Sequence, residues 1–219
     1  MQDAVAEDRR ARAEPTGWLV NRFVVPASRL AELPDADLRL SVVVDGPTRL
    51  DDPRIESVEV RADLDRVGGS TLEVYVELPA DAELEDWIPE LAARGLRAKL
   101  RCGGTSVPTA ARVAAFVRAC RRHEVAFKAT AGLHHPIRTD GEHGFLNLLA
   151  AAAFGDEEAI LGDAQTTSFS LDDGALRWRD RQASASEVAR VRRELFVGFG
   201  SCSVREPVDD LTALGVLPT

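Results

Sequence analysis

Disulfide-forming cysteine, long apolar runs and excess positive charge are scarce in this 219-residue chain, and each scarcity excludes a class of protein. Three cysteines, an odd number, do not make a disulfide framework. The longest apolar stretch, Leu146–Phe154, is too short to span a bilayer. A formal net charge of -9 argues against a nucleic-acid-binding protein, which carries a basic face. The charged N-terminal segment MQDAVAEDRR does not resemble a signal peptide, so we expect a cytoplasmic protein that binds neither membrane nor nucleic acid.

Lysine is scarcer still, because 25 of the 27 basic residues are arginine and the two lysines are Lys99 and Lys128. A GC-rich genome replaces lysine by arginine wherever any cation suffices. A lysine that remains therefore suggests a need for its primary amine, since arginine cannot lose its proton near neutral pH. The positions of these two residues test that suspicion.

The chain alternates short strand patterns with helical ones, which predicts βα units and mostly parallel strand pairing. Residues 1–16 are polar and are expected to be flexible, and residues 17–219 are expected to form a single domain. Asp172-Asp173-Gly174 predicts a hairpin turn. Eight segments have strand patterns: Trp18–Val25, Leu38–Asp45, Ile55–Ala62, Thr71–Leu78, Leu96–Cys102, Ala126–Ala131, Thr166–Leu171 and Leu195–Ser201. Eight such strands predict a small (β/α)8 barrel, and an open one-sided α/β sheet is the alternative.

Five of the expected strands alternate apolar and polar residues instead of reading as continuous apolar runs. The charges on their polar positions balance, five against five, which favours an enclosed, charged barrel interior. A solvated sheet face has no such need for balance. The acidic members are Asp45, Glu59, Asp63, Glu73 and Glu77, and the basic ones are Arg61, Arg97, Lys99, Arg101 and Lys128.

Both lysines fall on this polar face, near the C-terminal ends of consecutive expected strands. Active sites of β/α barrels lie at that end. A neighbouring cation and burial each favour the uncharged form of an amine, and an uncharged lysine attacks a carbonyl to form a Schiff base. The simpler interpretation is that both lysines only form ion pairs with acidic residues of the same face. In the catalytic interpretation, Glu77 is the acidic residue that transfers protons.

A local resemblance points in the same direction. The stretch Lys128-Ala129-Thr130-Ala131-Gly132, followed by Ile137-Arg138-Thr139, resembles the Lys-x-x-Gly-Gly-Ile-Arg-Thr stretch of deoxyribose-phosphate aldolase. That family of class I aldolases has a (β/α)8 barrel and a second lysine on the preceding strand, where Lys99 stands in this chain. The resemblance implies that Lys99 forms the Schiff base and that Lys128 tunes it. This chain departs from the family pattern at Arg101-Cys102 and at the insertion Leu133–Pro136. Other segments are similar to uncharacterised bacterial proteins.

Three of the four histidines, His134, His135 and His143, lie within ten residues after the second lysine strand. Histidine transfers protons near neutral pH, so His134 and His135 are candidate acid/base residues. The same three side chains are also a candidate site for a divalent metal such as zinc, although their spacing matches no known metal motif. We otherwise expect no cofactor.

Small residues at two strand ends predict sites for an anionic group, because they expose backbone N–H groups. Gly103 and Gly104 follow one strand and Gly200 and Ser201 the other, and Arg101 and Arg138 are the candidate cations. We therefore expect an aldolase- or lyase-like enzyme that acts on a small carbonyl compound with an anionic group. A phosphate is one candidate for that group. There are two alternatives: a metal-assisted lyase, isomerase or hydrolase, and a non-catalytic scaffold. The sequence leaves open whether the protein forms a homo-oligomer.

Overall fold

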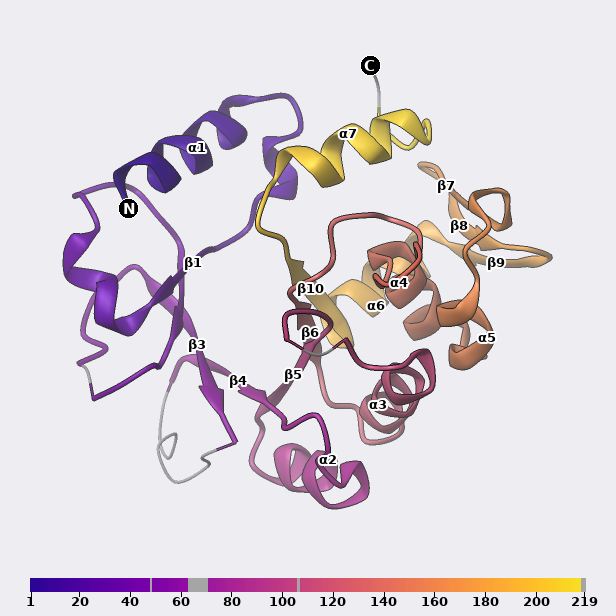
Figure 1. Ribbon diagram of the computed structural model, residues 1–219, viewed down its shortest axis with the longest axis horizontal. Helices are drawn as coiled ribbons and strands as arrows, with labels where there is room; N and C mark the ends of the chain where they lie inside the picture. The colour runs from indigo at the N-terminus through magenta and orange to yellow at the C-terminus, as the bar shows by residue number, and fades with distance from the viewer. Residues whose placement is uncertain (48, 63–70, 106, 218–219) are drawn as a thin grey trace. The chain divides into compact units, whose positions relative to one another are not determined.

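The chain divides into two compact units, Met1–Pro79 and Ala80–Thr219 (Figure 1). The computed structural model describes residues 1–47, 49–62, 71–105 and 107–217. Asp63, one of the charges in the expected balance, lies outside the described residues. Both units combine helices with parallel strands, so the expectation of a mixed α/β protein is confirmed. The expectation of a single domain stays a prediction.

The first unit is built around four parallel strands in the order β1-β2-β3-β4. Leu40 and Val42, which alternate along β2, are both fully buried, as their pattern predicts. The segment expected to be flexible contains α1, in which Val5 is buried and Asp8 forms an i,i+4 ion pair with Arg12. The elements of this unit are α1 (Gln2–Ala13), η1 (Gly17–Leu19), β1 (Phe23–Pro26), η2 (Ala27–Glu32), β2 (Leu40–Val43), β3 (Ile55–Arg61) and β4 (Glu73–Glu77).

Three polar residues of the first unit's strands, Ser41, Ser57 and Glu59, are buried as well. Glu59 on β3 is only 2 % exposed and accepts a hydrogen bond of 2.9 Å from the hydroxyl of Ser41. The hydroxyl of Ser57 in turn donates to Ser41 at 2.8 Å. A buried carboxylate needs such donors, because leaving it without hydrogen bonds in a dry environment is costly.

The second unit contains three parallel strands in the order β5-β6-β10. Its elements are α2 (Leu84–Ala93), β5 (Arg97–Arg101), α3 (Ala110–Arg122), β6 (Phe127–Thr130), α4 (Phe145–Phe154), α5 (Glu157–Gly162), η4 (Thr166–Ser168), β7 (Phe169–Leu171), β8 (Ala175–Trp178), β9 (Arg181–Ser184), α6 (Ala185–Glu194), β10 (Phe196–Gly200) and α7 (Arg205–Ala213). Helices α2, α3, α4 and α6 pack on the strands of this sheet. The ring of Phe127 lies 5.3 Å from those of Phe116 on α3 and Phe196 on β10, which ties the helix layer to the sheet.

The expected closed (β/α)8 barrel is not what the described strands form. The segment Thr166–Leu171, expected as a parallel strand, forms η4 and then β7, which belongs to an antiparallel sheet β7-β8-β9. The expected turn at Asp172 is confirmed, because the carboxylate of this residue accepts the N–H groups of Gly174 and Ala175. Within each unit the parallel sheet is open, which fits the alternative of an open α/β fold.

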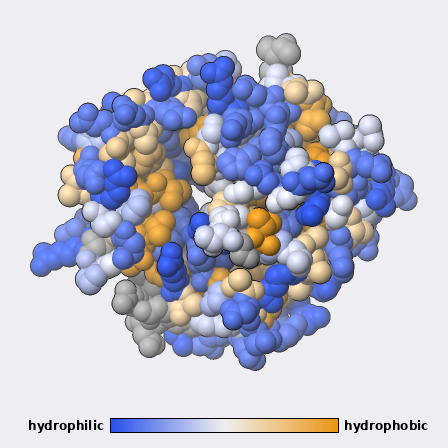
Figure 2. Space-filling model, viewed as in Figure 1, coloured by the Kyte–Doolittle hydropathy of each residue, from blue (hydrophilic) through white to orange (hydrophobic). Residues whose placement is uncertain are grey.

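In the part of the chain that the structure describes, no helix is both long and apolar enough to cross a membrane. The face shown in Figure 2 is mostly hydrophilic, with hydrophobic residues between the polar ones. Among the described residues, the most exposed large apolar side chain is that of Trp18, which is 68 % exposed.

Candidate functional site

The two lysines lie side by side in the second unit. Strands β5 and β6 are parallel neighbours, and their register pairs Lys99 with Lys128. Paired residues on neighbouring strands have their backbones about 4.8 Å apart and their side chains on the same face. Lys99 is 5 % exposed and Lys128 is half-buried, and neither lysine is without a partner in the protein. The structure thus brings the two primary amines onto one face of one sheet, as the sequence predicts.

The next strand leaves room beside Lys128. The register of β10 places Gly198 opposite Lys128 and Gly200 opposite Thr130, after a bulge that follows Phe196. A Cβ atom built on Gly198 would have nothing within 4 Å, so this side of Lys128 is open. The hydroxyl of Thr130, on the same face, is buried and has no hydrogen-bond partner within the described residues. Gly200 leaves less room beside Thr130, because a Cβ atom built there would lie 3.3 Å from the methyl group of Thr130, but an unsatisfied buried hydroxyl is still suited to binding a polar group of a ligand.

The loops that follow β5 and β6 cross at two glycines. A Cβ atom on Gly103 would lie 2.8 Å from Cα of Gly132, so only glycine permits this approach. Just before the crossing, Ala131 has a φ of 63°, a left-handed conformation that costs energy for a residue with a side chain. The chain is therefore held in an unfavourable conformation at the C-terminal end of the lysine strand.

Arg101 caps one of these loops. Its Nε donates a hydrogen bond of 3.1 Å to the carbonyl oxygen of Gly103, and its guanidinium also lies close to Gly104. The residue is exposed. The predicted anion-binding residues Arg101, Gly103 and Gly104 are thus brought together, and a cation lies over the loop that follows the Lys99 strand.

His134 and His135, in the loop after β6, each bind a carboxylate of α7. Nδ1 of His134 lies 3.0 Å from Glu206, and Nδ1 of His135 lies 2.7 Å from Asp210. The hydrogen bond with Asp210 is the main reason that the pKa of His135 is raised above its usual value, and Glu142 and Glu206 add to the effect. Imidazoles held by carboxylates in this way are suited to proton transfer.

His143 has a different environment from its two neighbours. It is 1 % exposed, and its Nε2 donates a hydrogen bond of 2.7 Å to the carbonyl oxygen of Pro108. Its Nδ1 lies 3.4 Å from the guanidinium of Arg138, and burial lowers its pKa. Both ring nitrogens are therefore engaged with the protein. Among the residues that the structure describes, no group of three or more His, Cys, Asp or Glu side chains is arranged to hold a metal ion. The metal alternative stays a prediction.

Residues 198–206 lead from β10 into α7, and several of their backbone N–H groups already donate hydrogen bonds to side chains of the same segment. The N–H groups of Arg205 and Glu206 donate to the hydroxyl of Ser203, and the N–H of Ser203 donates to the hydroxyl of Ser201. Side chains of this segment thus occupy the N–H groups of three residues that follow the predicted anion-binding residues Gly200 and Ser201. Glu77 lies half-buried on β4 of the first unit.

Sequence reasoning missed the partners of the loop between β6 and α4. Asn147, fully buried on α4, accepts a hydrogen bond of 2.8 Å from the backbone N–H of Arg138 and donates to the carbonyl oxygens of Ile160 and Asp163. A single amide within the apolar segment FLNLLAAAAF was a signal that could have identified it. Glu206 and Asp210 gave no comparable signal, since each follows its histidine by more than seventy residues.

Comparison of the chain with models of protein families, with curated proteins and with solved structures gives no match. The candidate site therefore has to be interpreted from its own geometry.

Proposed function

We propose that the second unit is an enzyme that forms a Schiff base between one of its two lysines and the carbonyl group of a small substrate. The observation that carries this proposal is the register of Lys99 with Lys128 on adjacent parallel strands, with an open space beside Lys128 at Gly198. In this reaction the amine adds to the carbonyl carbon and water leaves, which gives an iminium ion that stabilises a carbanion at the neighbouring carbon.

Lys128 is the better candidate for the nucleophile, although the resemblance to aldolases assigns this role to Lys99. Lys128 is half-buried and faces a glycine strand, so a substrate has room next to its amine. Lys99 is almost fully buried and is the neighbouring cation. Thr130 lies on the same face of the sheet as Lys128, and its unsatisfied hydroxyl is a further reason to place the substrate on this face.

The remaining groups supply proton transfer and substrate binding in this proposal. His135, paired with Asp210, moves a proton to or from the substrate, and His134 with Glu206 is its neighbour. Arg101 and the loop at Gly103 and Gly104 bind an anionic group of the substrate. The reaction class is the making or breaking of a carbon–carbon bond, or a related carbonyl reaction.

Borohydride trapping tests the proposal cleanly, because the sequence has only two lysines, Lys99 and Lys128, to compete with the amino terminus. The protein is incubated with acetaldehyde, pyruvate or dihydroxyacetone phosphate, reduced, digested and examined by mass spectrometry. We expect a stable secondary amine at Lys128, with its amount reduced by Lys99→Arg and abolished by Lys128→Arg.

A matched control adds Arg97→Lys to the double variant Lys99→Arg, Lys128→Arg. It restores a lysine two residues before Lys99 on the same face of β5, and we expect it to stay unmodified. The proposal fails if no probe yields an adduct on a strand lysine, or if modification of the amino terminus accounts for all of the trapped product.

A further inference from the structure

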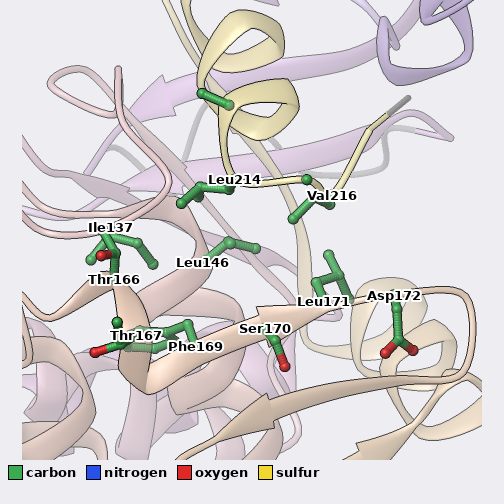
Figure 3. Close-up of a pocket in the computed structure, with 12 residues that line it drawn as sticks. Ile137, Leu146, Thr166, Thr167, Phe169, Ser170, Leu171, Asp172, Leu214 and Val216 are labelled. Carbon is green, nitrogen blue, oxygen red and sulfur yellow. The ribbon is translucent and has the colours of Figure 1, made fainter. Parts of the chain in front are cut away.

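A pocket of about 430 Å³ lies in the second unit, and Figure 3 shows residues that line it. Its walls come from η4 and β7 with the adjoining Asp172, from the last residue of α7 and the segment that follows it, and from the two residues Ile137 and Leu146. None of the described lining residues belongs to β5, β6 or β10. Its volume is in the range of pockets that bind small molecules.

Much of the lining is apolar. Leu146 and Ile137 are buried lining residues, and Leu214 is 39 % exposed. In Figure 3, Leu171 extends from β7 toward Val216 across the pocket. These side chains form a surface for the hydrocarbon part of a ligand.

Three lining residues carry a hydroxyl group, Thr166, Thr167 and Ser170, and in Figure 3 those of Thr167 and Ser170 point away from Leu214 and Val216. All three residues are exposed. A hydroxyl both donates and accepts, so that of Thr166 suits an alcohol, a carbonyl or an amide on the ligand.

The charges of the pocket disfavour an anion. Asp172 is the charged residue among the described lining residues, and no Lys, Arg or His accompanies it there. Its carboxylate already accepts hydrogen bonds from Arg177, at 2.6 Å, and from two backbone N–H groups. Arg177 already balances the charge of Asp172, so Asp172 gives little extra attraction for a cationic ligand. An anionic ligand would meet no balancing cation among the described lining residues.

The walls are held in place without a ligand. The antiparallel pairing with β8 fixes β7, and the histidine–carboxylate pairs at Glu206 and Asp210 hold α7. Leu211 of α7 and Leu217 beyond it are buried. A pocket that exists before binding saves the entropy of ordering its walls.

We infer that this pocket binds a small neutral molecule with an apolar body and one hydrogen-bonding group, at a site separate from the lysine pair. N-phenyl-1-naphthylamine is a suitable probe, and its sulfonated analogue 1-anilinonaphthalene-8-sulfonate differs from it chiefly by one negative charge. We expect the neutral probe to bind in calorimetry with a 1:1 ratio, and the sulfonate to bind about tenfold more weakly or not at all.

Two substitutions at the exposed edge locate the binding. Leu214→Trp reduces the space of the pocket and is expected to weaken the neutral probe about tenfold, whereas Val107→Trp, at an exposed residue outside the pocket, leaves its affinity unchanged. Leu214→Arg supplies the missing cation and is expected to raise the affinity for the sulfonate relative to the neutral probe.

The double variant Lys99→Arg, Lys128→Arg is expected to bind the neutral probe as the unchanged protein does, so failure of the lysine proposal and failure of this one are distinguishable. The inference is overturned if the neutral probe does not bind, if both probes bind equally, or if neither substitution at Leu214 changes the affinities.

Discussion

His135 and Asp210 are in hydrogen-bond contact at 2.7 Å although 75 residues separate them. The adjacent pair, His134 with Glu206, is 3.0 Å apart, and its carboxylate lies one turn earlier on α7. Two consecutive imidazoles thus bind two carboxylates on one face of a helix. These two contacts join the loop after β6 to α7, the helix that precedes the pocket residues Leu214 and Val216.

The pair of His135 and Asp210 predicts that stability depends on pH. Its hydrogen bond raises the pKa of His135 in the folded protein above the ordinary value near 6.5. The stabilisation is therefore fully present below the unfolded-state pKa and is lost as the pH rises through the higher folded-state pKa. Asp210→Asn should lower the free energy of unfolding more at pH 5.5 than at pH 8.5, by less than about 1 kcal/mol because the pair is partly exposed. Urea unfolding at the two pH values measures this difference.

Asp209→Asn is the matched control for that experiment, since it removes the same charge from α7 at a residue that pairs with Arg205 instead of a histidine. Its effect on stability should be the same at both pH values. Equal pH dependence in the two variants would contradict the assignment to His135.

The crossing of Gly103 and Gly132 predicts that even one methyl group is harmful there. In Gly103→Ala the new Cβ would lie 2.8 Å from Cα of Gly132, and a backbone atom cannot rotate away. We expect a loss of about 1–3 kcal/mol, the usual range for overpacking, measured by urea unfolding. Gly198→Ala is the control with open space around it, and its stability should change little. Because its methyl group enters the space beside Lys128, it should still reduce borohydride trapping. A stable Gly103→Ala protein would show that the loops separate easily.

Asn147 predicts a large loss from a change that preserves shape. In Asn147→Leu the N–H of Arg138 and the carbonyl oxygens of Ile160 and Asp163 lose a buried partner. Each buried group without a partner costs about 1–3 kcal/mol, so the total loss should be about 3 kcal/mol or more. Urea unfolding measures it. Asn21→Leu, at the exposed second asparagine, should stay within about 0.5 kcal/mol of the unchanged protein. A small effect of Asn147→Leu would mean that water replaces the amide.

Most parallel strands of this protein were predictable from local pattern. Strands β2 to β6 and β10 all fall within segments that have strand patterns, and those of β2 to β6 alternate apolar and polar residues, because a period of two is a property of the strand itself. Helix α1 was not expected, since its mean pattern is polar and its support comes from the pair of Arg12 with Asp8 and from the burial of Val5. Closure of a barrel was also not predictable, because it depends on tilt and register across all strands, and the segment Thr166–Leu171 joined an antiparallel sheet instead.

The candidate site also has a part that the sequence predicted and a part that it did not. The shared face of Lys99 and Lys128 followed from strand period and from the adjacency of consecutive parallel strands. The carboxylates that hold His134 and His135 come from a helix at the other end of the chain, and only tertiary packing brings them together. His143 was grouped with these histidines by sequence distance, but the fold buries it against Pro108.

The three cysteines predict a selective reaction that also checks the core of the second unit. Cys102 and Cys120 are fully buried, and burial raises the pKa of Cys102 to about 12 and that of Cys120 well above its usual range. Since the thiolate is the reactive form, both thiols should resist iodoacetamide at pH 8, whereas the exposed Cys202 should react. Mass spectrometry should show one alkylated cysteine in the folded protein and three in urea. Cys202→Ser should leave the folded protein unmodified. Rapid alkylation of Cys102 would contradict the packing at the end of β5, where Cys102 is buried just before Gly103, because that thiol is reached only if the loop after β5 opens.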